Sequence, residues 1–195
     1  MSGRPLILLD RDGVINEESE AYVKAPSEFL PIPGSLDAIA RLSAAGHPIA
    51  VVTNQSAVGR GLISPATLES IHAGLREAVG LRGGSIDRIE VCPHRPDAGC
   101  DCRKPATGLL RSAARHLERD AATSVLIGDR ASDLQAARSF GCEALLVRTG
   151  HGRATEKTVG GEAALGVFDD LARATDWILA ERLGSAARAP SGPSA

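Results

Sequence analysis

Two aspartates lie two residues apart at the end of a short apolar run. Asp10 and Asp12 form the sequence DRDG after residues 6–9, and Gly13 allows the chain to turn there. Both carboxylates can therefore approach one reaction centre. One carboxylate can attack phosphorus to give an aspartyl phosphate, and the other can protonate the leaving oxygen and later deprotonate a water. Taken alone, these four letters are more typical of a polar turn.

More carboxylates follow a later apolar run, in the sequence GDRASD. Asp129 and Asp133 would add oxygen ligands beside Asp10. Magnesium is bound in proteins by a few carboxylates together with phosphate and water oxygens. We therefore predict that Asp10, Asp12 and Asp129 bind a catalytic Mg2+. Asp133 has a second interpretation, because an acidic residue in the first turn stabilises a helix by itself.

A hydroxyl and an amine complete this set of polar residues. Thr53, at the end of VVTN, could donate to a phosphoryl oxygen, and Lys104, in CRKP, supplies the positive charge that a five-coordinate phosphoryl group requires. Each is weak evidence alone, since a threonine after a strand is ordinary and a lysine is usually solvated. The order Asp-x-Asp, Thr, Lys, Gly-Asp is a rare chance match, and it predicts phosphoryl transfer.

A separate group of metal ligands lies just before Lys104. Cys92, His94, Cys100 and Cys102 form the pattern C-x-H-x5-C-x-C, which matches the Cys3His set of a closed structural zinc site. A closed site has no open position for water, so this Zn2+ is not expected to be catalytic. We expect it to order the loop that ends at Lys104.

The elements that must position these residues follow from the pattern of apolar runs. Short runs rich in Val, Ile and Leu alternate with segments of helical period, which is typical of an α/β fold with a parallel sheet covered by helices on both faces. Expected strands are residues 6–9, 49–52, 89–91, 125–127 and 145–147. Expected helices are 35–45, 65–79, 108–117, 133–140 and 169–182, with Ser64 and Ser132 as N-caps and Gly141 as C-cap. In such a sheet, ligands bind beyond the carboxyl ends of the strands.

Composition limits the remaining possibilities. The chain has 195 residues, 43% of them hydrophobic, which suits one domain over 1–184, and we expect a disordered polar tail over 185–195. The net charge of -2 argues against nucleic acid as a partner. No segment is long enough to cross a bilayer, and the cysteine spacing does not suit a disulfide framework. We therefore expect a cytoplasmic protein without a membrane partner, and a monomer.

Taken together and in this order, the motifs resemble those of the haloacid dehalogenase superfamily of phosphotransferases, over Asp10 to Asp133. The resemblance implies a Rossmann-like open, mainly parallel sheet with Asp10 as nucleophile. It also implies a phosphatase with Asp12 as acid and base, because dehalogenases lack the second aspartate and transport ATPases carry threonine there. Glu18 and Tyr22 lie in the segment that closes over the ligand in this superfamily, so they could touch substrate.

The stretches LDRDGVIN, TNQSAVGRG, CPHRPDAGCDCRKP and IGDR resemble a subgroup without a large cap domain, which contains heptose bisphosphate phosphatases and histidinol-phosphate phosphatases. LLVRTGHGR is more similar to the heptose type, which implies a small phosphorylated sugar that loses its 7-phosphate; histidinol phosphate is the alternative substrate. The residues expected to bind substrate are Arg11, Asn54, Gln55, Ser56, Arg60, Arg103 and Arg130.

A reading from another class is a zinc-stabilised phosphosugar-binding module that has lost turnover. Binding alone would not require the nucleophile and proton donor of the DRDG motif, which argues against that reading. The histidines other than the zinc ligand have no convergent partners in the sequence. We therefore expect surface roles for His47, His72, His116 and His151.

Overall fold

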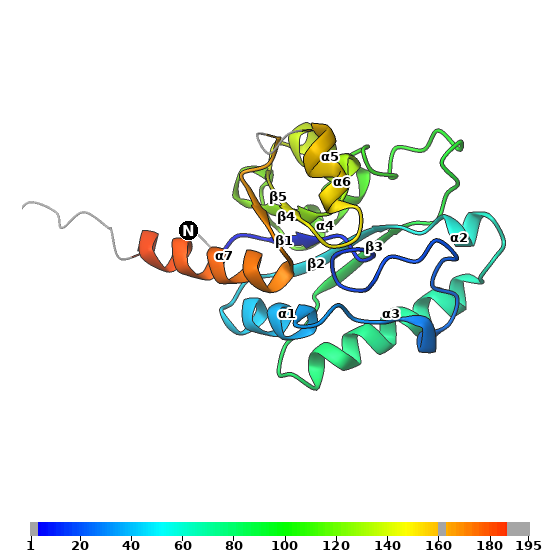
Figure 1. Cartoon of the computed structure of the whole chain (residues 1–195), viewed down its shortest axis with the longest axis horizontal. Coiled ribbons are helices and arrows are strands. Elements are labelled where there is room, and N and C mark those ends of the chain that lie inside the picture. Colours follow the sequence, from blue (N-terminus) through cyan, green and yellow to red (C-terminus); the bar gives the residue numbers. More distant parts are fainter. Residues whose placement is uncertain (1–3, 160–162, 187–195) are drawn as a thin grey trace, which may run out of the picture.

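The computed structural model describes residues 4–159 and 163–186, which form a layered α/β structure (Figure 1). Its centre is a six-stranded sheet in the order β3-β2-β1-β4-β5-β6, with every pairing parallel. The strands are β1 (Ile7–Leu9), β2 (Ile49–Asn54), β3 (Arg88–Cys92), β4 (Val125–Gly128), β5 (Glu143–Val147) and β6 (Gly166–Phe168). The predicted open parallel sheet is thus confirmed.

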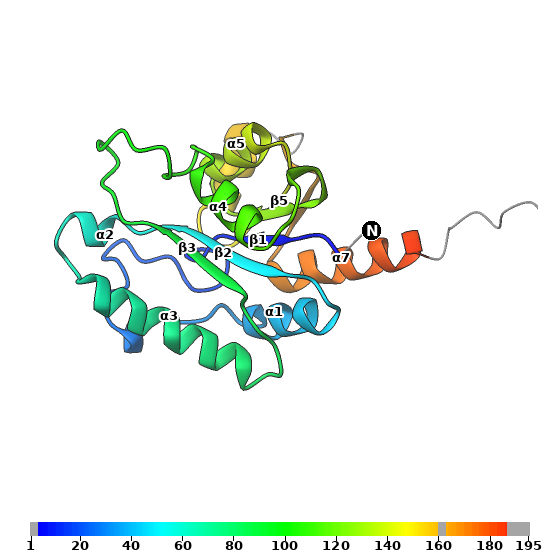
Figure 2. The same cartoon turned by 180° about the vertical axis from the view of Figure 1, so that it is seen from behind.

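Helices cover both faces of this sheet. They are α1 (Ser35–Ala44), α2 (Ser56–Gly59), α3 (Pro65–Gly80), α4 (Gly108–His116), α5 (Ala131–Phe140), α6 (Gly152–Val159) and α7 (Leu171–Ala186), with the 3-10 helices η1 (Pro26–Glu28) and η2 (Ala121–Thr123). Helices α1, α3 and α7 lie on one face, and α4, α5 and α6 lie on the other (Figures 1 and 2). Within the described residues, the connections between strands contain no separate cap domain.

The central strand β1 is buried on both sides because its apolar residues alternate between two cores. Ile7 and Leu9 pack with α1, α3 and α7, whereas Leu6 and Leu8 pack with α4 and α5. All four side chains are completely buried. Each such burial contributes about 1.5–3 kcal/mol. Asp10 therefore follows a strand that is fixed from both faces.

The helix ends agree with the sequence at two positions and differ at a third. The Ser64 hydroxyl accepts a hydrogen bond from the Thr67 amide at the start of α3, and Gly141 ends α5 in the left-handed conformation at φ 87°, as expected. Ser132 is not an N-cap, because α5 begins at Ala131 with Arg130 as its cap. The Asp133 carboxylate, three residues into the helix, accepts a hydrogen bond from the Arg130 amide and so satisfies the amide of the N-cap residue.

Besides the two 3-10 helices, the elements that were not predicted are α2, α6 and β6. Two of them are short, and β6 is an edge strand of three residues whose side chains are only partly buried, so its apolar pattern is weak. Helix α7 also continues to Ala186, two residues into the segment expected to be a tail. The rest of that expected tail, 187–195, lies outside the described residues.

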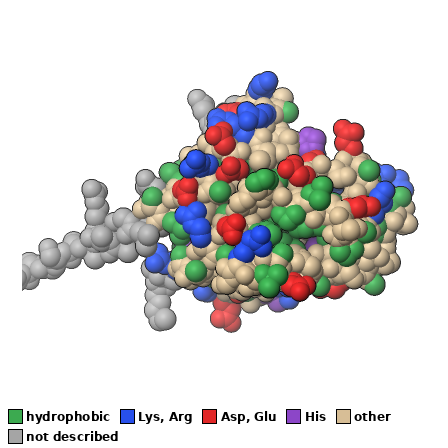
Figure 3. Space-filling model, turned by 60° about the horizontal axis from the view of Figure 1, so that its bottom comes forward, with side chains coloured by type: hydrophobic (Ala, Val, Ile, Leu, Met, Phe, Trp, Pro, Cys, Tyr) green, Lys and Arg blue, Asp and Glu red, His purple; other side chains and the backbone are tan. Residues whose placement is uncertain are grey.

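The surface carries charges of both signs. On the face shown in Figure 3, basic and acidic side chains lie interspersed, in keeping with the net charge of -2. This face offers no extended positive surface of the kind that binds nucleic acid. In the part of the chain that the structure describes, none of the helices combines the length and the apolar character needed to cross a membrane.

Candidate active site

Three aspartates converge at the carboxyl edge of the sheet. Asp10 follows β1, Asp129 follows β4, and Asp133 lies in the first turn of α5. One oxygen from each carboxylate lies within 4.8 Å of the others, and all three residues are buried. Oxygens from parallel strands meet here because neighbouring strands end at the same edge. The arrangement is a hard, oxygen-rich cluster.

Lys104 is the cation that faces this cluster. Its Nζ lies 3.0 Å from Asp10 Oδ1 and 2.7 Å from Asp133 Oδ1, and its side chain is 1% exposed. The side chain of Asn54, at the end of β2, holds the Lys104 main chain from both sides: its Nδ2 donates to the Lys104 carbonyl and its Oδ1 accepts from the Lys104 amide, each at 3.1 Å. Strand β2 therefore positions the lysine through its backbone.

The cluster contains more negative charge than Lys104 can balance. Burial is the main cause that raises the pKa of Asp10 to about 7; Lys104 opposes this rise, while the charges of Asp133 and Asp12 add to it. Burial, followed by the charges of Asp10 and Asp133, raises the pKa of Asp129 to about 8. Asp129 Oδ1 is buried and accepts no hydrogen bond from the described residues. A divalent cation with oxygen ligands fits this donor set and would favour the ionised carboxylates.

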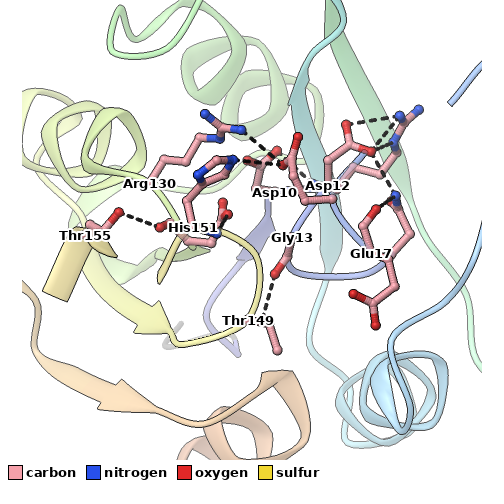
Figure 4. A network of polar contacts seen from close by, with 12 residues as sticks. Asp10, Asp12, Gly13, Glu17, Arg130, Thr149, His151 and Thr155 are labelled. Carbon is pink, nitrogen blue, oxygen red and sulfur yellow. Dashed lines mark hydrogen bonds and ion pairs between the residues drawn. The ribbon is translucent and has the colours of Figure 1, made fainter. Parts of the chain in front are cut away.

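The loop after β5 and the first turns of α6 pack against the cluster and fix Asp129. The His151 amide donates to Asp129 Oδ2 at 2.8 Å, the Thr155 hydroxyl donates to the Asp129 carbonyl at 2.8 Å, and the Thr149 hydroxyl donates to the Gly13 carbonyl at 2.6 Å (Figure 4). Gly13 has a φ of +80°, and a Cβ there would collide with Asp129 Oδ2. Glycine is therefore required in the DRDG turn for the two strand ends to approach each other.

The Asp12 carboxylate is held apart from the three clustered aspartates. It accepts hydrogen bonds from Arg11 Nη2 at 2.8 and 3.0 Å, from Asn16 Nδ2 at 2.9 Å and from Gln55 Nε2 at 2.6 Å. Burial alone would raise the pKa of Asp12, but the Arg11 guanidinium and the hydrogen bonds from Asn16, Arg11 and Gln55 outweigh it and hold that pKa below its ordinary value. The predicted magnesium set of Asp10, Asp12 and Asp129 thus differs from the observed cluster, in which Asp133 contributes the third side chain.

A pocket of about 530 Å³ opens beside these residues. It contains the seven residues expected to bind substrate, together with Asp10, Asp12 and Lys104. Its lining residues are Asp10, Arg11, Asp12, Glu18, Ser19, Glu20, Tyr22, Val23, Asn54, Gln55, Ser56, Arg60, Pro96, Arg103, Lys104, Arg130, Ser132 and His151. Thr53 is not part of this lining; it is buried beneath it and accepts a hydrogen bond from Gln55 Nε2 at 2.8 Å.

The polar residues of the pocket differ in how free they are to bind a ligand. Arg60 and Arg103 come from two loops, and Arg103 Nη1 donates a long hydrogen bond, 3.4 Å, to the His94 carbonyl. Arg130 lies 3.1 Å from Glu18 Oε2, so an ion pair joins two parts of the lining. The Arg11 guanidinium contacts Asp12 and is 1% exposed, so it is less available to a ligand than the other arginines.

The sequence interpretation assigned surface roles to His151 and to two histidines that are buried. His151 lines the pocket and lies 3.9 Å from Glu18. A signal was present, because His151 follows β5 at the same edge as the other strand ends. The expected surface role is wrong for His47 and His72, which are 3% and 1% exposed. His116 is exposed on α4, as expected.

The second candidate metal site is the predicted one. Cys92, His94, Cys100 and Cys102 each place one ligand atom within 4.8 Å of the others. Four sulfur–sulfur and sulfur–nitrogen distances are 3.2–3.7 Å. A tetrahedral zinc with bonds of 2.0–2.3 Å separates its ligands by about 3.5–3.8 Å, so the donor set fits Zn2+.

Fold and site define a class of protein. A parallel sheet that brings an aspartate pair, a lysine and a second acidic motif to one edge is the arrangement expected of haloacid dehalogenase-like hydrolases. In agreement, the pattern of the family described as HAD-hydrolase-like matches residues 101–174, which include Lys104 and Asp129.

Relatives that match over nearly their whole length show which members of this class the chain resembles. The chain is 50% identical over 167 residues to the D-glycero-beta-D-manno-heptose-1,7-bisphosphate 7-phosphatase of Pseudomonas putida, covering 86% of this chain and 95% of that protein. It is 48% identical to the enzyme of the same name from Pseudomonas aeruginosa, covering 90% and 98%. The crystal structure of D,D-heptose 1,7-bisphosphate phosphatase from B. bronchiseptica, complexed with magnesium and phosphate, has a TM-score of 0.87 and 47% identity, covering 91% and 99%. The chain belongs to this family of haloacid dehalogenase-like heptose bisphosphate phosphatases.

Proposed function

We propose that this protein is a magnesium-dependent phosphatase that hydrolyses the 7-phosphate of D-glycero-β-D-manno-heptose 1,7-bisphosphate, a precursor of lipopolysaccharide or related surface glycans. The observation that carries the proposal is that Asp10, Asp12 and Lys104 line one pocket. The same pocket is lined by two arginines, Arg60 and Arg103, that form no ion pair with the described residues. One anionic group can sit against Lys104 while a second is held by the arginines. Relatives that share half of the sequence carry the same activity in their names.

Asp10 is proposed as the nucleophile. Its carboxylate would attack the phosphorus of the 7-phosphate to give an aspartyl phosphate, and the sugar oxygen would leave with a proton. Lys104, 3.0 Å from Asp10, would balance the negative charge of the phosphoryl group during transfer. The Thr53 hydroxyl accepts from Gln55, which leaves its own proton to donate to a phosphoryl oxygen.

Asp12 is proposed as the group that carries the proton. The hydrogen-bond donors around its carboxylate favour the ionised form, which is the form that takes a proton from water when the aspartyl phosphate is hydrolysed. Protonation of the leaving sugar oxygen in the first step requires the other form.

Asp10 and Asp129 would hold Mg2+, with Asp133 in position to assist and Asp12 the third ligand expected from the sequence. When bound, the ion supplies positive charge to the phosphoryl oxygens. The Cys92, His94, Cys100 and Cys102 cluster would hold a structural Zn2+. A zinc there would order the loop that carries Arg103 and Lys104 into the pocket.

We also propose that the protein acts as a cytoplasmic monomer. Support for the location comes from cysteines that are all unpaired within the described residues, three of them arranged as metal ligands. Support for the monomer comes from the site, because one chain supplies both the pocket lining and the buried residues Thr53, Asp129 and Asp133 next to it.

The test is to measure kcat/KM for heptose 1,7-bisphosphate and for histidinol phosphate, with magnesium and with EDTA. We expect the bisphosphate to be the better substrate by at least an order of magnitude, because the remote phosphate adds binding energy that positions the reacting one. EDTA should abolish turnover. A preference for histidinol phosphate would replace the heptose assignment by the alternative, and the absence of turnover on both would favour a binding module.

A further inference from the structure

One buried histidine has no part in the mechanism described above. His72 lies on α3, among the buried residues that recur at helical spacing along this helix: Leu68, Ile71, His72, Leu75 and Val79. It is 1% exposed. Burying a polar side chain costs folding free energy unless the side chain is hydrogen-bonded. The hydrogen-bond partner of His72 therefore indicates its role.

That partner is Arg11, the residue between the two aspartates of the DRDG motif. Arg11 Nη1 lies 3.2 Å from His72 Nε2, and both side chains are buried. A guanidinium can only donate, so Nε2 must be the acceptor and the imidazole must be neutral. Burial, followed by the charges of Arg11 and Arg76, lowers the pKa of His72 to about 3, which keeps the ring neutral.

The other side of the Arg11 guanidinium faces Asp12. Its Nε lies 3.2 Å from Asp12 Oδ1, and its Nη2 lies 2.8 and 3.0 Å from the two carboxylate oxygens. All three guanidinium nitrogens therefore have partners: Nε and Nη2 contact Asp12, and Nη1 contacts His72. Because the fork is planar and rigid, fixing Nη1 on His72 fixes the direction in which Nε and Nη2 point.

We propose that His72 is a positioning residue that aims the Arg11 guanidinium at Asp12 and so sets where the proton-carrying carboxylate lies. The contact runs from helix α3 through one buried arginine to the active site. Arg11 therefore acts behind Asp12, rather than as a contact to substrate. This inference rests on the proposed function only in giving Asp12 its proton-transfer role.

The variants His72→Leu and His72→Gln separate this role from simple packing. Leucine has a similar size but no acceptor, whereas the glutamine amide oxygen can accept from Arg11. We expect kcat to fall about tenfold in His72→Leu and to stay within about threefold of wild type in His72→Gln. KM should change less than about twofold in both. His116→Leu, on the exposed side of α4, is the matched control and should leave kcat unchanged.

A double-mutant cycle with Asp12→Asn is the decisive measurement. If His72 acts through Asp12, His72→Leu should change the residual kcat of Asp12→Asn by less than about twofold. The same tenfold fall in both backgrounds would overturn the proposal, because a packing defect does not depend on Asp12.

Crystal structures of the two variants give a readout that needs no activity. Arg11 should turn away from Asp12 in His72→Leu and remain on it in His72→Gln. An Arg11 that stays on Asp12 in the leucine variant would also overturn the proposal. A wild type that releases no phosphate would count against the proposed function alone, and the position of Arg11 would then decide the inference about His72.

Discussion

The two candidate metal sites of this protein differ in the ligands they offer and in their exposure to solvent. The aspartate cluster of Asp10, Asp129 and Asp133 is buried at the strand ends, uses oxygens only, and reaches the pocket through Asp10. The cysteine cluster lies in a partly exposed loop and offers four protein ligands, enough to close a tetrahedron. An open oxygen site suits an ion that must share its coordination with phosphate, and a closed thiolate site suits an ion that holds a loop. Changes at the first should therefore affect rate, and changes at the second should affect stability.

The largest effect is expected at the oxygen site, in Asp10→Asn. An amide cannot form the aspartyl phosphate, so phosphate release should fall by about 10⁴-fold or more. The thermal midpoint should hold or rise, because the substitution removes a buried charge. Asp37→Asn, at an exposed position of α1, is the control and should keep the wild-type rate. A rate near that of wild type in Asp10→Asn would show that another residue attacks phosphorus.

At the cysteine site the expected effect is on folding. Cys100→Ser should lose bound zinc and lower the melting temperature by on the order of 10 °C, because structural zinc contributes folding free energy directly. Elemental analysis and thermal melts measure both quantities. Cys142→Ser removes a thiol outside the cluster and should retain one zinc per chain. Wild-type protein that is stable without zinc would mean that the cluster holds the loop through thiol packing alone.

Arg103 joins the two sites, since it follows the last zinc ligand and lines the pocket. A charge-assisted contact from arginine contributes about 1.5–3 kcal/mol, so Arg103→Ala should lower kcat/KM for the bisphosphate on the order of tenfold to a hundredfold. The loss should be much smaller for an aryl phosphate. Arg95→Ala, in the same loop but outside the pocket lining, controls for disturbance of the loop. Equal losses on both substrates would mean that Arg103 orders the loop and does not contact the remote phosphate.

The smallest effect expected is a pH dependence of the stabilisation by magnesium. In the metal-free protein the pKa values of Asp10 and Asp129 are raised from 3.8 to about 7 and about 8. The folded state therefore binds more protons than the unfolded state between about pH 4 and 8, and its stability falls as pH rises through that window. Mg2+ requires the ionised carboxylates, so it should raise the melting temperature by a few degrees more at pH 8 than at pH 6. The reverse trend would place the ion elsewhere.

The same comparison explains what could be predicted from the sequence. The strand ends and the cysteine spacing were found because β1 and β4 are continuous apolar runs that end in charged residues, and because four metal ligands lie in one short segment. Both signals are local. They place Asp10, Asp129 and Cys92 without knowledge of any distant contact.

The remaining features depend on contacts between segments far apart in sequence. His72 looked like a surface residue because its partner, Arg11, is 61 positions away. Asn54 was predicted as a substrate contact and lines the pocket, but its second role, holding the Lys104 backbone 50 positions away, was not predicted. The place of Asp133 in the acidic cluster depends on how α5 packs against β1. Pairings of this kind are decided by the fold and leave no local pattern.

The most direct test of the whole account is to follow the reaction on D-glycero-β-D-manno-heptose 1,7-bisphosphate by phosphorus NMR, with wild-type enzyme and magnesium. The account predicts that one equivalent of inorganic phosphate appears, that the 7-phosphate resonance disappears, and that the 1-phosphate resonance persists. It further predicts that Asp10→Asn leaves both resonances unchanged. Loss of the 1-phosphate, or of both phosphates at similar rates, would contradict the proposed orientation of the substrate between Lys104 and the pocket arginines.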